Sequence, residues 1–139
     1  SLVNRTYEIG MSEISIREKT GLLAYSPLAA GYLTGKYRNK QIPKNSRLDL
    51  HYDNYHRYHN KRTYDAIDEY YKISKKYKIS LAKLSLAFVN SRDFVTSNII
   101  GATKMEQLKE NIDSINVSLD QQIIDEINLV HQNNPNPSP

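Results

Sequence analysis

Apolar side chains recur every three to four residues along much of the chain, which is the spacing of one face of a helix. The pattern is clear where Ala66, Ile67, Tyr70 and Ile73 share one face. It predicts helices over residues 4–19, over 63–77, from Ser80 onward with Leu81, Leu84, Ala87 and Phe88 inward, over a segment that ends near Ser114, and from Ser118 or Asp120 to Val130.

Two short apolar runs break this helical pattern. Leu22–Tyr25 ends at Ser26-Pro27, where proline cannot donate to a strand ladder, and Phe94–Ile100 ends at Gly101. Continuous apolar runs are typical of strands buried on both faces, and strands that alternate with helices indicate parallel βα units. Because two parallel strands cannot close a barrel, we expect the chain to be part of a larger α/β fold.

Two segments lack a periodic pattern. Residues 38–60 are rich in Asn, Pro, Ser and His and predict a long loop, of a length that is usually a functional lid or mobile. The proline-rich residues 134–139 predict an extended tail.

The turn that follows the second run carries candidate ligand-binding chemistry. Thr103 and Glu106 have the spacing of a capping box, so a helix should begin there with unpaired backbone N–H groups that suit a phosphate. Lys104 adds a cation, and Gln107 and Asn111 place two amides on one helical face. The alternative is an ordinary βα turn that binds nothing.

Composition narrows the classes of protein further. The 139 residues suffice for one domain, and 39% hydrophobic content excludes a disordered tail. The net charge of +4 is spread along the chain, which favours anionic ligands but predicts no nucleic-acid partner. No apolar run approaches a membrane span, so no membrane insertion is expected.

Cysteine and histidine usage bears on redox compartment and metals. Cysteine is absent, which excludes disulfides, thiolate zinc sites and a thiol nucleophile, and suits the reducing cytoplasm in which we expect the protein. The spacing of His51, His56 and His59 with Asp53 does not match a metal site, so no metal ligand is predicted.

Two longer motifs resemble a known family. Tyr25–Tyr37, with the sequence YSPLAAGYLTGKY, is similar to the seventh-strand segment of aldo-keto reductases. Ile99–Asn111 is similar to their eighth-strand cofactor segment, and the two occur in the family's order. The ending, Val130-His131 through Pro135-Asn136-Pro137, looks most like the Tas-like branch, which is akin to potassium-channel β subunits.

The resemblance implies a fold for residues 1–139. They would form the C-terminal part of a (β/α)8 TIM barrel, strands seven and eight with their helices, mostly helical by residue count, with strand six just upstream of Ser1. The sequence starts with Ser1 and not with an initiator Met, so we expect the chain to begin inside a domain.

The resemblance also implies NADP(H) as the cofactor, bound without a Rossmann fingerprint. Tyr25 would contact the nicotinamide, and small neighbours would line the pyrophosphate path. Lys36 would pair with phosphate, and Arg47 would belong to a belt over the cofactor. The remaining positions that the resemblance assigns are Ser26, Pro27, Leu28, Ala29 and Ala30 on the pyrophosphate path, Gly101, Thr103 and Lys104 at the 2′-phosphate, and Gln107, Glu110 and Asn111 at adenine and its ribose.

Each of these residues also has an ordinary structural role open to it. Tyr25 could fill a layer of the barrel, Lys36 and Lys104 could be solvated surface lysines, and Gly31 and Gly35 could serve a turn. Only the joint occurrence of these residues in motif order favours the cofactor interpretation.

The resemblance implies hydride transfer to a carbonyl, which in this family is aided by a Tyr, a Lys, an Asp and a His. No residue of this chain lies in a sequence context that matches those four. We therefore assign no catalytic residue and expect the chain alone to be inactive. It could be a portion of a reductase of small aldehydes or ketones, could work with a separate N-terminal half, or could be a non-catalytic interaction or regulatory protein with a cofactor pocket. Open strand edges predict that the isolated chain self-associates or is partly molten.

Overall fold

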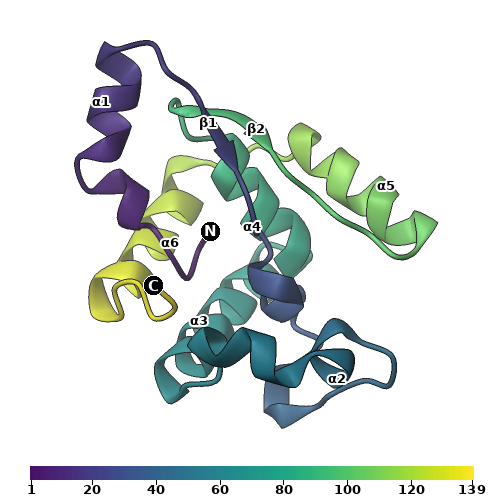
Figure 1. Ribbon diagram of the computed structural model, residues 1–139. Coiled ribbons are helices and arrows are strands. Elements are labelled where there is room, and N and C mark those ends of the chain that lie inside the picture. The colour runs from purple at the N-terminus through teal and green to yellow at the C-terminus, as the bar shows by residue number, and fades with distance from the viewer.

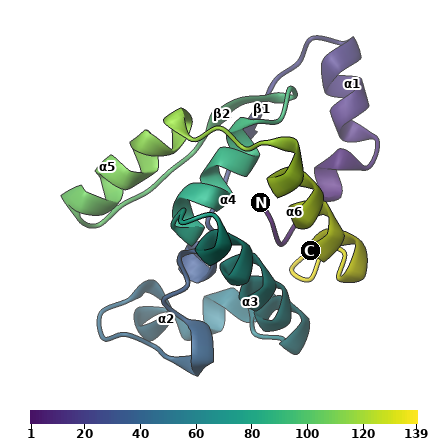
Figure 2. The same cartoon turned by 180° about the vertical axis from the view of Figure 1, so that it is seen from behind.

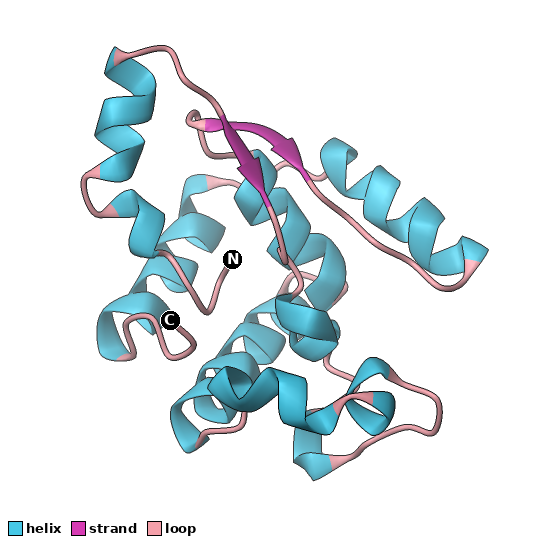
Figure 3. Ribbon diagram, in the orientation of Figure 1, coloured by secondary structure: helices cyan, strands magenta, loops and turns pink.

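The computed structural model describes residues 1–139 as a two-stranded parallel sheet surrounded by helices (Figures 1 and 3). The strands are β1 (Leu22–Ala24) and β2 (Val95–Asn98). The helices are α1 (Met11–Arg17), α2 (Arg47–Leu50), α3 (Lys61–Lys76), α4 (Leu81–Asn90), α5 (Met105–Asp113) and α6 (Gln121–Asn133), and short 3-10 turns cover Thr6–Glu8, Ala29–Thr34, Arg38–Lys40, Tyr52–Tyr58 and Ser114–Asn116.

Helix α4 forms the centre of the core. All of its residues from Leu81 to Val89 except Lys83 are buried. It packs against β2, α5 and α3, and Figure 2 shows it in the middle of the molecule with α3, α5 and α6 around it. The sheet therefore rests on an almost entirely buried helix, which fixes the position of both strands.

The expected helices over 63–77, from Ser80 and from Asp120 are confirmed. Ala66, Ile67, Tyr70 and Ile73 are buried on one face of α3 as the pattern predicts. The hydroxyl of Ser80 accepts the N–H of Lys83 at 3.1 Å, and the carboxylate of Asp120 accepts the N–H of Ile123 at 2.8 Å. Capping side chains thus begin α4 and α6, as N-cap chemistry requires.

The N-terminal part differs from expectation in two ways. The helix over 4–19 is interrupted at Gly10, which has φ 85° and separates Thr6–Glu8 from α1. Three apolar side chains of α1, Met11, Ile14 and Ile16, are about half exposed. The strands are not buried on both faces either, because helices cover one side only and Leu23 remains 60% exposed on the other.

The expectation of a long loop over 38–60 is wrong. Helix α2 begins in it at Ser46, whose hydroxyl accepts the N–H of Asp49 at 3.3 Å. Leu48 and Tyr58 are buried, so the segment is anchored to the core by aromatic and aliphatic packing.

The C-terminal tail contains no helix or strand, but it does not run straight into solvent. It turns at Asn136, with φ 44°, and returns to the body of the molecule. The N–H of Ser138 donates to the carbonyl of Val3 at 3.1 Å, and its buried hydroxyl lies 2.7 Å from that of Thr63. The N-terminal and C-terminal ends of the chain are thereby held together.

None of the helices is long and apolar enough to cross a membrane.

Candidate functional site

The two sequence motifs leave the sheet at the same edge. In the parallel pair, Ala24 lies opposite Asn98, and the N–H of Ile99 donates to the carbonyl of Ala24 at 2.8 Å. Residues 25–30 and 99–104 therefore both begin at the carboxyl end of the sheet (Figure 1). In α/β folds, that edge is where ligands bind.

The turn after β1 has an unusual backbone. Ser26, Ala29 and Ala30 have φ values of 54°, 48° and 55°, in the left-handed region that non-glycine residues seldom occupy. Such strain is concentrated at functional sites in proteins. The N–H groups of Leu28 and Ala30 find no acceptor within the chain, so the turn presents backbone donors of the kind that bind anions.

Lys36 lies against this turn. A β-carbon built on Gly31 would be 3.0 Å from Cε of Lys36 and 3.2 Å from its Nζ, so the lysine side chain crosses the glycine closely. The ammonium also lies 4.9 Å from the centre of the Tyr37 ring. Lys36 and the turn after β1, which belong to the same sequence motif, therefore also lie together in space.

Burial differs along the turn. Pro27 and Ala29 are buried and fix it to the core, whereas the Tyr25 side chain is 68% exposed. An exposed ring at the end of a strand is available to a ligand and does not fill the interior.

The second motif begins its helix one residue later than expected. Lys104 occupies the N-cap position of α5 and makes no side-chain capping bond, so the capping box of Thr103 with Glu106 is wrong. Instead, Oε1 of Gln107 accepts the N–H of Thr103 at 3.2 Å and lies 3.3 Å from its hydroxyl. The N–H groups of Met105, Glu106 and Gln107 have no acceptor within the chain.

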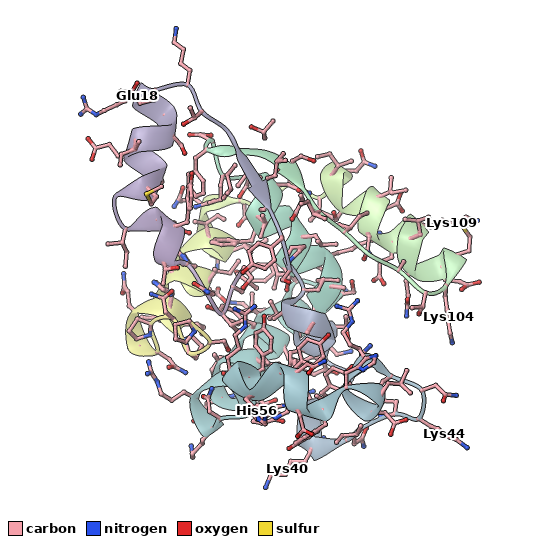
Figure 4. The ribbon with its side chains drawn as sticks, viewed as in Figure 1. Glu18, Lys40, Lys44, His56, Lys104 and Lys109 are labelled. Atoms are coloured by element: carbon pink, nitrogen blue, oxygen red, sulfur yellow. The ribbon has the colours of Figure 1, made fainter.

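Lys104 therefore lies beside a set of free donors at the positive end of α5. Figure 4 shows its side chain at the outer end of α5. The combination of a helix N-terminus with a neighbouring ammonium group suits a phosphate.

The other polar groups of α5 are partly engaged within the protein. Asn111 is only 5% exposed, and its amide donates a long hydrogen bond of 3.4 Å to the carbonyl of Gly101. The carboxylate of Glu110 accepts the hydroxyl of Ser80 at 2.5 Å, which ties α5 to the start of α4. These contacts position the loop before α5. The Nε2 group of Gln107 remains free of partners.

Arg47 stands apart from both motifs. It is exposed in the first turn of α2 and has no hydrogen bond or ion pair with any other side chain. The structure gives no contact that joins it to the two turns.

The sequence pattern does not identify one residue that lies near the site. Arg57 lies in Tyr52–Tyr58 and donates from Nη2 to the hydroxyl of Tyr58 at 2.8 Å, and its pKa responds to the neighbouring phenol of Tyr25. The prediction of a loop over 38–60 concealed it, since nothing in the local pattern indicates that this segment returns to the end of β1.

The histidines of the same segment make aromatic contacts. The rings of His56 and His59 lie 5.9 Å apart, and that of His59 lies 4.1 Å from Tyr52. Burial first, and His56 second, lower the pKa of His59. No group of three His, Asp or Glu side chains is positioned to hold a metal ion.

A surface groove of about 450 Å³ lies elsewhere, between α3 and α6. Its wall includes the ion pair of Arg38 with Asp68, at 2.6 Å, and the exposed side chain of Leu129. Because it is remote from the carboxyl edge of the sheet, the groove does not belong to the candidate site.

Comparison with known proteins gives matches along the whole chain. The profile of the Aldo/keto reductase family matches residues 1–131. Protein tas from Escherichia coli K12 is 41% identical over 139 residues, which are 100% of this chain and 40% of that protein. A probable voltage-gated potassium channel subunit beta from Oryza sativa subsp. japonica is 37% identical over 121 residues, 83% of this chain and 36% of that protein.

A solved structure supports the same fold. The glycerol dehydrogenase of Gluconobacter oxydans superposes with a TM-score of 0.75 at 22% identity, over 97% of this chain and 41% of that chain. The chain spans about 40% of the length of the curated relatives it matches.

Proposed function

The chain belongs to the aldo/keto reductase family and has the fold of part of its TIM barrel, and we propose that it forms the NADP(H)-binding portion of a reductase of aldehydes or ketones. The catalytic groups would come from the part of the relatives that this chain does not cover. The chain alone is then expected to bind cofactor without catalysing its oxidation.

The pairing of Ala24 with Asn98 is the observation that carries this proposal. It starts both motifs from one edge, so that an elongated dinucleotide can contact one turn with its nicotinamide half and the other with its adenosine half. A shift of one strand by one residue would turn the side chains that follow to the opposite face.

Several features of the two turns fit a nucleotide with three phosphate groups. The free N–H groups of Leu28 and Ala30 and the ammonium of Lys36 are suited to the pyrophosphate. The free N–H groups at the start of α5, with Lys104, are suited to the 2′-phosphate. Within this proposal, the residues that line the pyrophosphate path are Ser26, Pro27, Leu28, Ala29 and Ala30, and those of the 2′-phosphate and adenosine end are Gly101, Thr103, Lys104, Gln107, Glu110 and Asn111.

The exposed ring of Tyr25 would lie against the nicotinamide and hold one of its faces away from water. A bound NADPH would supply the hydride. The buried amide of Asn111, through its bond to Gly101, would act by keeping the loop before α5 in place. Arg47 has no contact in the structure that supports its role in a belt, and that role stays a prediction from the family motif.

Calorimetric titration of the purified chain with NADPH and NADH tests the proposal. We expect saturable binding of both, with NADPH bound more tightly because only it carries the 2′-phosphate. Equal affinity for the two would contradict the role of the α5 N-terminus. The proposal would be rejected if NADPH bound neither to the chain nor to a complex of the chain with the part of a relative that it does not cover.

A second function is favoured by one observation, the 37% identity to a potassium channel subunit beta. On this alternative, the cofactor pocket would regulate an interaction and the whole protein would turn over no carbonyl. NADPH oxidation by the complemented barrel, measured with a small aldehyde at saturating cofactor, distinguishes the two.

A further inference from the structure

Arg57 is a cation without an acidic partner, in a segment that packs against the turn Ala29–Thr34 after β1. Arg5, Arg17 and Arg38 each pair with a carboxylate, whereas the only side-chain bond of Arg57 goes to the hydroxyl of Tyr58, at 2.8 Å. A guanidinium has several N–H donors in one plane, so most of its donors remain free.

The protein nevertheless holds this side chain in place. Its Cζ lies 4.9 Å from the centre of the Tyr58 ring, and that ring is 3% exposed and packs 5.1 Å from the ring of Tyr32. The backbone of Arg57 belongs to Tyr52–Tyr58, next to His56, which Figure 4 labels on the lower surface. A fixed aromatic wall behind an exposed guanidinium reduces the entropy lost when a ligand binds.

The guanidinium lies beside the turn that follows β1. The hydroxyl of Tyr58 accepts from it, and the Tyr58 ring packs against Tyr32, which belongs to the 3-10 turn Ala29–Thr34. Partial burial lowers the pKa of Arg57, but Tyr58 and Tyr25 outweigh this and raise its pKa, so the side chain stays charged. Neutral phenols add hydrogen-bond donors around the cation and bring no negative charge to neutralise it.

We propose that Arg57, with the phenol group of Tyr58, binds the carboxylate or phosphate group of an anionic carbonyl substrate. A planar guanidinium binds two oxygens of either group in parallel. The assignment rests on the proposed function, since the segment with Arg57 packs on the turn that follows Tyr25, the residue proposed to contact the nicotinamide. It narrows the substrate class from small aldehydes and ketones to those that carry an oxyanion.

The test uses three aromatic aldehydes of similar size: 4-carboxybenzaldehyde, 4-formylphenyl phosphate and the neutral methyl 4-formylbenzoate. Each is titrated into the chain with and without NADP⁺, with amide shifts as the readout. We expect the anionic aldehydes to bind about tenfold more tightly than the ester, the size of effect expected for hydrogen bonds to a charged group. A preference between the two anions would identify carboxylate or phosphate as the group recognised.

Variants separate recognition from structure. Arg57→Gln should bring all three probes to the affinity of the ester, and Arg57→Lys should keep part of the preference because it keeps the charge. Arg17→Gln, which removes an exposed arginine paired with Glu13 on α1, should change nothing. Equal binding of the ester and the anions, or an unchanged preference in Arg57→Gln, would overturn the proposal.

Two outcomes distinguish this inference from the proposed function. If Arg57→Gln weakens NADP⁺ as much as the anionic aldehydes, Arg57 contacts the cofactor and the inference is wrong. If the chain binds no NADP⁺ but holds the anionic aldehydes through Arg57, the oxyanion site stands and the cofactor site fails.

Discussion

Gly21 offers a sharp test of how β1 and β2 pair. It directly precedes β1, and a β-carbon built on it would lie 1.6 Å from Oγ1 of Thr96 and 2.9 Å from its Cβ. Rotating the threonine hydroxyl cannot relieve the second contact, so Gly21→Ala must push the two strands apart. This is the pairing that brings both motifs to one edge.

Whether Gly21→Ala raises or lowers the free energy of unfolding shows whether the contact with Thr96 exists. The φ of Gly21 lies outside the left-handed range, so without the contact an alanine would stabilise the fold by about 0.4–1 kcal/mol through the unfolded state. Overpacking of this kind costs about 1–3 kcal/mol. We therefore expect Gly21→Ala to lower the free energy of unfolding, with a net loss of about 1–2 kcal/mol.

Urea unfolding followed by far-ultraviolet circular dichroism, at one protein concentration, measures the change. Gly101→Ala is the matched control, because its φ is likewise outside the left-handed range and nothing lies within 4 Å of the added carbon. It should leave stability unchanged or raise it. In a Thr96→Gly background, Gly21→Ala should no longer destabilise. A Gly21→Ala protein as stable as the parent would refute the register on which the site is built.

Three further predictions follow from single contacts. Asp120→Ala removes the cap of α6 and should lower the free energy of unfolding by about 1 kcal/mol. Ser118→Ala removes an exposed hydroxyl without a partner and should leave it unchanged, as the urea midpoints of the two variants would show. Because burial and then His56 lower the pKa of His59, the unfolded chain binds its proton more readily. Stability should therefore fall as pH drops from about 7 towards 5, and His59→Gln should flatten that slope in urea midpoints. Lys104→Ala should weaken NADPH more than NADH in calorimetric titrations, and equal losses would remove Lys104 from the 2′-phosphate site.

The sequence predicted the elements whose causes are local. Helices α4 and α6 begin at the capping residues Ser80 and Asp120, and α3 shows its buried face as a periodic pattern, so each could be identified from a short window. The two strand ends with their motifs were also identified, since proline and glycine mark them.

What the sequence could not give depends on contacts between distant residues. The segment 38–60 folds because Tyr58 and Leu48 pack into an aromatic core that includes Tyr32. The tail returns because Ser138 meets Thr63 and Val3. In none of these cases does a local pattern indicate the partner.

The candidate site was predicted in part for the same reason. The motif identified the turn and Lys36, but only the structure places the lysine over Gly31. The capping box failed because Gln107 competes with Glu106 for the donors before α5, and both residues satisfy a similar spacing rule.

Amide chemical-shift mapping of the ¹⁵N-labelled chain during an NADP⁺ titration, with NAD⁺ as the comparison, tests the central claim most directly. The account predicts saturable shifts at the N–H groups of Leu28 and Ala30 with both nucleotides, and at Met105, Glu106 and Gln107 more strongly with NADP⁺. Saturable shifts confined to another surface, such as the groove between α3 and α6, would contradict it.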